Sequence, residues 1–114
     1  MVHHKLAVLF FRTASGNEPV RTWLKSLDRT DMKTIGTDIM TIQFTWPTKM
    51  PLVRPLGGGL FEVRSGVSQG NARVFFTIEK GKMVLLHGII KKSQKTPKAD
   101  LNLARERQSK VRGI

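Results

Sequence analysis

Apolar and polar residues alternate along the second half of the chain in a pattern that predicts β-strands. Three segments show this pattern, Leu60–Ser65, Ala72–Glu79 and Met83–Ile90, and the short connections between them predict an antiparallel meander. Side chains in a strand point alternately to opposite faces, so the pattern places Arg64 and Arg73 together, opposite the larger apolar set. We therefore expect a sheet with one apolar face and one face that carries cations.

The first half of the chain predicts one strand followed by two helices. The nearly continuous apolar run Lys5–Phe11 is typical of a strand that is buried on both faces. A short helix is expected from about Glu18 to Ser26, and a longer helix is expected between Asp28 and Pro47. The longer helix carries an apolar stripe at spacings of three and four, formed by Met32, Ile35, Ile39, Ile42 and Trp46. These two helices form a hairpin that can cover one face of the sheet.

The remaining segments are a connection and a last helix. Residues 47–59 contain three prolines and three consecutive glycines, which predicts an irregular connection with Gly57–Gly59 as a flexible hinge. Thr96 can cap a final helix that has Pro97 at its first position. At 114 residues the chain has room for one domain, residues 1–114. The expected fold class is α+β: an N-terminal strand, a two-helix hairpin, an antiparallel three-strand meander and a C-terminal helix.

The chain is strongly basic. Twenty Lys and Arg stand against eight Asp and Glu, a formal net charge of +12. Ten of these cations, against two acidic residues, lie between Lys80 and Ile114. A charge of this size attracts polyanions such as nucleic acid, acidic proteins or anionic membrane. We expect a polyanionic partner in preference to a merely solvated basic surface.

Several classes of protein are disfavoured by the composition. There are no cysteines, which excludes disulfides and thiolate metal sites. His3 and His4 stand beside the start and His87 is isolated, so we expect no metal site and no cofactor. The apolar run near the start is too short for a signal peptide or a membrane span, so we expect a cytoplasmic protein with no membrane partner.

The cations near the end of the predicted meander suit the cleavage of RNA. Cleavage without a metal needs a base for the 2′-hydroxyl proton, cations for the phosphoryl oxygens and an acid for the departing 5′-oxygen. Arg64 and Arg73 suit phosphate binding, because a guanidinium stays charged and can meet two oxygens at once. Glu62, two residues before Arg64 on the same strand face, is a possible base. Neighbouring cations favour the neutral amine of a lysine, which adds three candidates for proton transfer, Lys91, Lys92 and Lys95.

Each of these residues also has a plainer interpretation. Glu62 and Arg64 can form a solvent-exposed ion pair worth less than ~1 kcal/mol, and lysines after a strand are commonly a solvated turn. His87 lies in an apolar strand, which favours a hydrogen-bonded core histidine over an acid or base. Phe75 suits the core as well as it suits a platform for stacking bases.

The whole layout resembles the RelE/ParE toxin superfamily. Three segments, Leu60–Arg64, Ala72–Phe76 and Leu85–Pro97, are similar to its phage-derived, HigB-like branch. The most specific part of the resemblance is the last segment, in which a His-Gly pair is followed by paired lysines and then Lys-Thr-Pro.

The resemblance implies the toxin of a type II toxin–antitoxin system. Most such toxins are mRNA interferases, metal-independent endoribonucleases that act at the ribosome and inhibit growth, and their partner here would be a HigA-like helix-turn-helix antitoxin. By position, Arg73 matches the arginine that contacts the scissile phosphate, Lys92 the basic residue after the last strand, and Arg64 the basic end of the preceding strand. The predicted catalytic set is Arg73, Lys92, Lys91 and Glu62. The predicted substrate-binding set is Arg64, Lys95 and Lys98.

The chain also departs from the RelE pattern. It has no tyrosine, so the aromatic hydroxyl that RelE uses near its C-terminus is missing. Leu60 and Glu62 stand where RelE carries lysines, which leaves the acid and the base unassigned. Two other functions are open: a ParE-type toxin that inhibits DNA gyrase by binding, and an RNA-binding regulator without catalytic activity.

Overall fold

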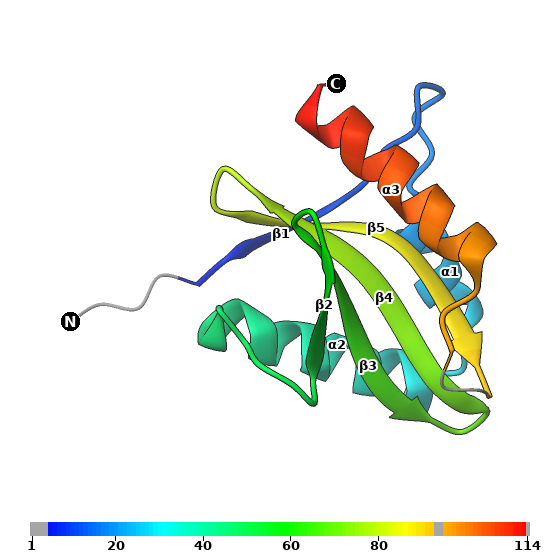
Figure 1. Ribbon diagram of the computed structural model, residues 1–114. Helices are drawn as coiled ribbons and strands as arrows, with labels where there is room; N and C mark the ends of the chain where they lie inside the picture. Colours follow the sequence, from blue (N-terminus) through cyan, green and yellow to red (C-terminus); the bar gives the residue numbers. More distant parts are fainter. Residues whose placement is uncertain (1–4, 93–94, 114) are drawn as a thin grey trace.

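A mixed five-stranded sheet separates two helices on one face from a third helix on the other (Figure 1). The computed structural model describes residues 5–92 and 95–113, and three helices and five strands lie within them. His3, His4, Ser93 and Gln94 lie outside the described residues. In the described part of the chain, every helix is too short or too polar to cross a membrane. The α+β class that the sequence predicts is confirmed.

The predicted meander forms the centre of the sheet. Its strands are β3 (Leu60–Val67), β4 (Gly70–Glu79) and β5 (Lys82–Lys91), paired antiparallel in chain order. Lys80 and Gly81 form the tight turn between β4 and β5, and both have positive φ angles, 51° and 75°.

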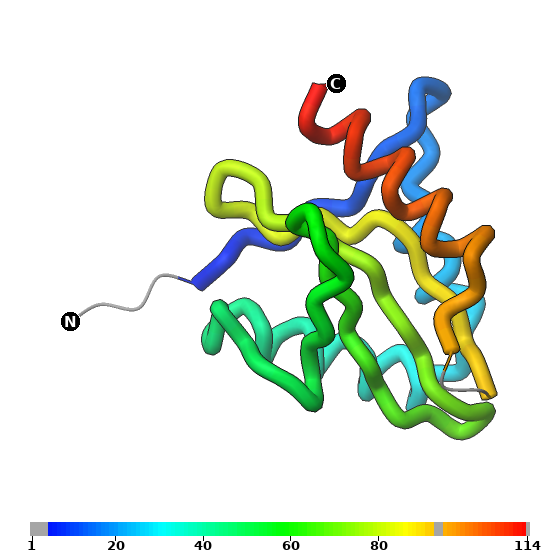
Figure 2. Tube along the Cα trace, in the orientation of Figure 1, coloured from blue at the N-terminus to red at the C-terminus, as the bar shows by residue number. Residues whose placement is uncertain are grey.

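Two further strands flank the meander, in the sheet order β1-β5-β4-β3-β2. Strand β1 (Ala7–Phe10) pairs in parallel with β5, and in Figure 2 the blue N-terminal segment meets the beginning of the yellow strand β5. The prediction of an N-terminal strand buried on both faces is wrong, because β1 lies at the edge of the sheet and Leu9 is 45% exposed. An edge strand has a neighbour on one side only, so part of it faces solvent.

Strand β2 (Val53–Gly57) lies where the sequence predicts an irregular connection, so that prediction is wrong for this segment. It pairs antiparallel with β3 at the other edge of the sheet. Pro55 is tolerated because an edge strand needs only half of its backbone hydrogen bonds. The expected hinge at Gly57–Gly59 is a tight β2–β3 turn in which all three φ angles are positive, 90°, 63° and 80°. Glycine adopts such angles without steric cost, so the triple glycine serves a defined turn.

Helices α1 (Pro19–Ser26) and α2 (Arg29–Thr45) cover one face of the sheet, as predicted. The buried part of the α2 stripe is Ile35, Ile39 and Ile42, whereas Met32 is 37% exposed. Asp31 is buried in place of Met32, and its carboxylate accepts hydrogen bonds from the backbone N–H and the hydroxyl of Ser68, at 3.1 and 2.6 Å. This carboxylate ties α2 to the turn between β3 and β4.

Helix α3 (Lys98–Arg112) packs across β4 and β5 on the opposite face. Its side chains also hold the β2–β3 turn. Arg105 donates to the carbonyl oxygens of Leu56 and Gly57, at 2.7 and 3.2 Å, and Gln108 donates to the carbonyl oxygen of Gly58 at 3.0 Å. The residue at the N-cap position of α3 is Pro97, so Thr96 does not cap the helix as predicted.

A β-bulge interrupts the pairing of β4 with β5. Phe76 is paired with Leu85 and Phe75 with His87, so Leu86 is an extra residue on β5. Leu86 packs in the core beneath α3, and the ring of His87 stacks on Phe75 on that same face. Two consecutive side chains of β5 therefore point toward α3, and strict alternation is broken at this point.

Gly88 follows this bulge and lies against helix α1. A Cβ atom at Gly88 would lie 2.4 Å from ring carbons of Trp23 in α1. No side chain fits there unless the indole moves, so the glycine of the His-Gly pair allows close packing of α1 on β5.

Candidate functional site

The predicted site residues of the strands share one end and one face of the sheet. Cross-strand pairing places Arg64 of β3 opposite Arg73 of β4, and Lys91 of β5 opposite Asn71 of β4. The alternation of β4 places both pairs on the face that carries α3. Thr96 contacts this face just before α3 begins, so the backbone between Lys95 and the start of α3 also lies there.

Glu62 and Arg73 form the buried base of the site. Both residues have a relative exposure of 0%. The Thr96 hydroxyl joins them: it accepts a hydrogen bond from Arg73 Nη1 at 2.8 Å and donates one to Glu62 Oε2 at 3.0 Å. Arg73 Nη1 also lies 3.9 Å from Glu62 Oε2.

Arg64 completes this network at its outer side. Its Nε donates to Glu62 Oε1 at 2.9 Å, and its side chain is 24% exposed. The interpretation of Glu62 and Arg64 as a solvent-exposed pair is therefore wrong. The Glu62 carboxylate is fully buried and lies close to both Arg64 and Arg73. Thr96, from a distant part of the sequence, covers it.

Arg73 is held as a buried cation. Removal from water lowers the pKa of its guanidinium, and the nearby Glu62 carboxylate acts in the opposite direction and raises it. An arginine remains protonated at neutral pH even so. In this conformation the side chain lies beneath Thr96, and its predicted contact with the scissile phosphate stays a prediction.

The other predicted cations surround this base. Lys91 is half-buried at the end of β5, and three lysines are exposed: Lys92, Lys95 and Lys98. With Arg64 they form the solvent-accessible part of the site. We call the buried Glu62, Arg73 and Thr96 together with Arg64 and these four lysines the basic face.

A histidine–carboxylate pair adjoins the basic face. His87 Nε2 lies 2.7 Å from Asp100 Oδ1 in the first turn of α3, and the two side chains are 17% and 27% exposed. The imidazole stacks on the ring of Phe75, with centroids 5.9 Å apart and an interplanar angle of 16°. Phe75 itself is buried in the core. The sequence pattern does not predict this pair, because the bulge in β5 and the return of the chain into α3 together create it.

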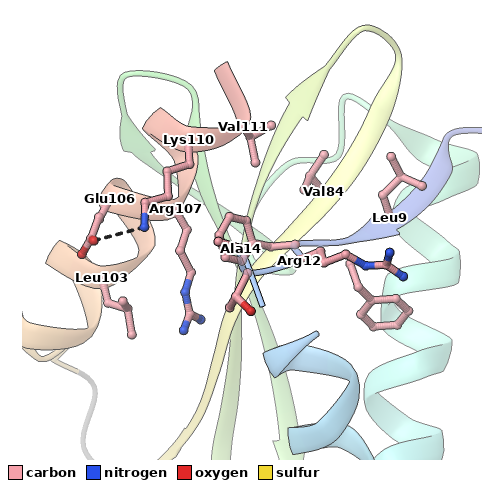
Figure 3. Close-up of a pocket in the computed structure, with 12 residues that line it drawn as sticks. Leu9, Arg12, Ala14, Val84, Leu103, Glu106, Arg107, Lys110 and Val111 are labelled. Carbon is pink, nitrogen blue, oxygen red and sulfur yellow. Dashed lines mark ion pairs between the residues drawn. The ribbon is translucent and has the colours of Figure 1, made fainter. Parts of the chain in front are cut away.

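A separate groove lies between α3 and β1 (Figure 3). It has a volume of about 510 Å³, and its lining in the described part of the chain includes none of the predicted site residues. Its charged groups already have partners: Lys110 pairs with Glu106 at 3.5 Å, and Arg107 donates to the carbonyl oxygen of Leu86 at 2.8 Å. Burial lowers the pKa of Arg107, and its neighbour Glu106 raises it. The basic face is thus the stronger candidate for a functional site.

Comparison with known proteins identifies a family for most of the chain. A search of curated proteins found no match. The family model described as "Phage derived protein Gp49-like (DUF891)" matches residues 22–109. That range contains strands β2 to β5 and most of each helix, and it includes every residue of the basic face. The chain therefore belongs to this Gp49-like family, which is associated with toxin–antitoxin systems and related to RelE-like toxins.

Proposed function

We propose that this protein is the toxin of a type II toxin–antitoxin system and that it acts as a metal-independent, ribosome-associated mRNA endoribonuclease of the HigB-like branch. Membership of the Gp49-like family supports a phage-derived toxin. The finer proposal rests on one observation: exposed cations gather over a buried Glu62–Arg73 pair at one end of the sheet. A RelE-like fold, with two helices on one face and one on the other, is part of the proposal.

The basic face suits the binding of a phosphodiester. Arg64 and the exposed lysines are the first charges that an RNA backbone meets, and each neutralised phosphate strengthens binding in a salt-dependent way. Arg73 adds positive potential from below, where water is excluded and charge is weakly screened. Such an arrangement stabilises the negative charge that builds on the phosphoryl oxygens as the bond to the 5′-oxygen breaks.

The partner that follows from this proposal is a HigA-like antitoxin with a helix-turn-helix domain. Toxin–antitoxin membership is consistent with an antitoxin partner. An acidic surface on that partner would neutralise the basic face, because opposite potentials steer association and strengthen it.

The test is to induce the protein in a bacterium that lacks the antitoxin and to map mRNA 5′ ends. We expect growth arrest together with new ends inside translated messages. Lys92→Gln combined with Lys95→Gln should weaken both effects, whereas Lys25→Gln combined with Lys33→Gln removes the same charge from the helical face and should not. Arrest with unchanged message ends would contradict the proposal; inhibited supercoiling would then favour a gyrase-binding toxin, and RNA binding without new ends a regulator.

A further inference from the structure

The bulge in β5 gives His87 an orientation that strict alternation would not. Under strict alternation along β5, position 87 would share a face with Leu85, which lies in the core under α1 and α2. Because of the bulge, the imidazole instead points toward α3 and remains partly exposed. Bulges commonly re-aim a side chain beside a functional site.

His87 also lies next to the buried base of the basic face. Pairing aligns Glu62, Phe75 and His87 in one row across β3, β4 and β5. The segment that leads into α3 connects the same two places: Thr96 contacts Glu62, and Asp100, four residues later, contacts His87. The imidazole therefore lies on the strand next to β4, which carries Arg73, and on the same strand as Lys91, while Arg64 on β3 is one strand further away.

We propose that His87, oriented by Asp100, is the general base for RNA cleavage by this protein; the inference rests on the proposed function. With Asp100 accepting the Nε2 proton, Nδ1 carries the free lone pair. Nδ1 removes the proton from the 2′-hydroxyl, and the 2′-oxygen attacks the phosphorus. The P–O5′ bond breaks, the 5′-oxygen takes a proton from solvent, and the imidazolium releases its proton to solvent. The products are a 2′,3′-cyclic phosphate and a 5′-hydroxyl, and no co-reactant is consumed.

Asp100 acts as a positioning residue in this scheme. Its carboxylate fixes the tautomer of the ring and stabilises the imidazolium that forms when Nδ1 takes the proton. The ring of Phe75 stacks on the imidazole of His87 and so restricts its orientation further. A purely structural alternative is that the pair only clamps the start of α3 to β5, and the experiment must separate the two roles.

The experiment measures single-turnover cleavage of ribosome-bound mRNA by purified variants. His87→Ala should lower the rate about 10²- to 10⁴-fold, the usual contribution of a general base, with RNA affinity unchanged. Added imidazole should restore part of that rate, because the small base can occupy the vacated space. Asp100→Asn, which keeps a hydrogen-bonding side chain, should lower the rate less than His87→Ala does.

His87→Gln guards against a variant that merely fails to fold. It keeps a polar side chain beside Asp100, and its thermal midpoint is compared with that of the wild type. A folded His87→Gln variant that cleaves at the wild-type rate would overturn the inference and leave the proposed function standing. If His87→Ala loses rate and added imidazole restores none of it, the inference would also be overturned. The pair would then serve only to clamp the start of α3 to β5. Absence of cleavage by the wild type would instead overturn the proposed function itself.

Discussion

Replacing Glu62 by Ala should lower the free energy of unfolding by about 3–5 kcal/mol, because it leaves a buried cation without its counter-charge. Glu62 and Arg73 are both fully buried, and the carboxylate also accepts hydrogen bonds from Arg64 and Thr96. All these donors would lose their acceptor at once. Chemical denaturation followed by circular dichroism measures the change.

Glu106→Ala is the matched control for this experiment. Glu106 pairs with Lys110 on the surface of α3, where both side chains are 63% exposed. A surface pair of this type contributes at most about 0.5 kcal/mol. Equal losses in the two variants would contradict the description of Glu62 as the buried centre of the network.

Replacing Arg73 by Lys should lower the rate of RNA cleavage about 10- to 100-fold, although the charge is retained. A lysine cannot reproduce the planar fork that donates to Thr96 beside Glu62. A charge-assisted hydrogen bond from Arg73 to the phosphoryl oxygens would contribute about 1.5–3 kcal/mol, and its loss from the transition state accounts for a change in rate of this size. The assay compares single-turnover rates at saturating protein.

Lys98→Arg is the control for Arg73→Lys, since it exchanges the same two side chains at an exposed position of the basic face. Its rate should stay within about twofold of the wild type, as expected for a cation that meets phosphate as a point charge. A folded Arg73→Lys variant with full activity would reduce Arg73 to a generic cation.

Much of the sheet follows from short-range pattern. The alternation of β3 and β4 correctly predicts that Arg64 and Arg73 share a face. Side chains along a strand alternate between the two faces, so the apolar pattern of each strand is enough to assign its other residues to a face. The apolar spacing along α2 likewise predicts its buried residues Ile35, Ile39 and Ile42, although Met32 is exposed. Strand β2 is not predicted, since Pro55 and the glycines after it are typical of loops, and only its place at the edge permits them.

The chemistry of the site depends on contacts that local pattern does not contain. The strand pattern predicts that Glu62 is exposed, but Thr96, 34 positions later, covers it. The apolar strand around His87 predicts a core residue, but the bulge turns its side chain toward Asp100. Both effects come from segments distant in sequence, so they could not be predicted from the alternation of a single strand.

The most direct test of the central claim is the end chemistry of the cleaved message. Purified protein is mixed with ribosome-bound mRNA, and with the same message carrying one 2′-deoxynucleotide at the mapped cleavage position. We predict fragments with 5′-hydroxyl and 2′,3′-cyclic phosphate ends from the first message, and no cleavage at the substituted position of the second. Cleavage that ignores the missing 2′-hydroxyl, or an intact first message, would contradict the account.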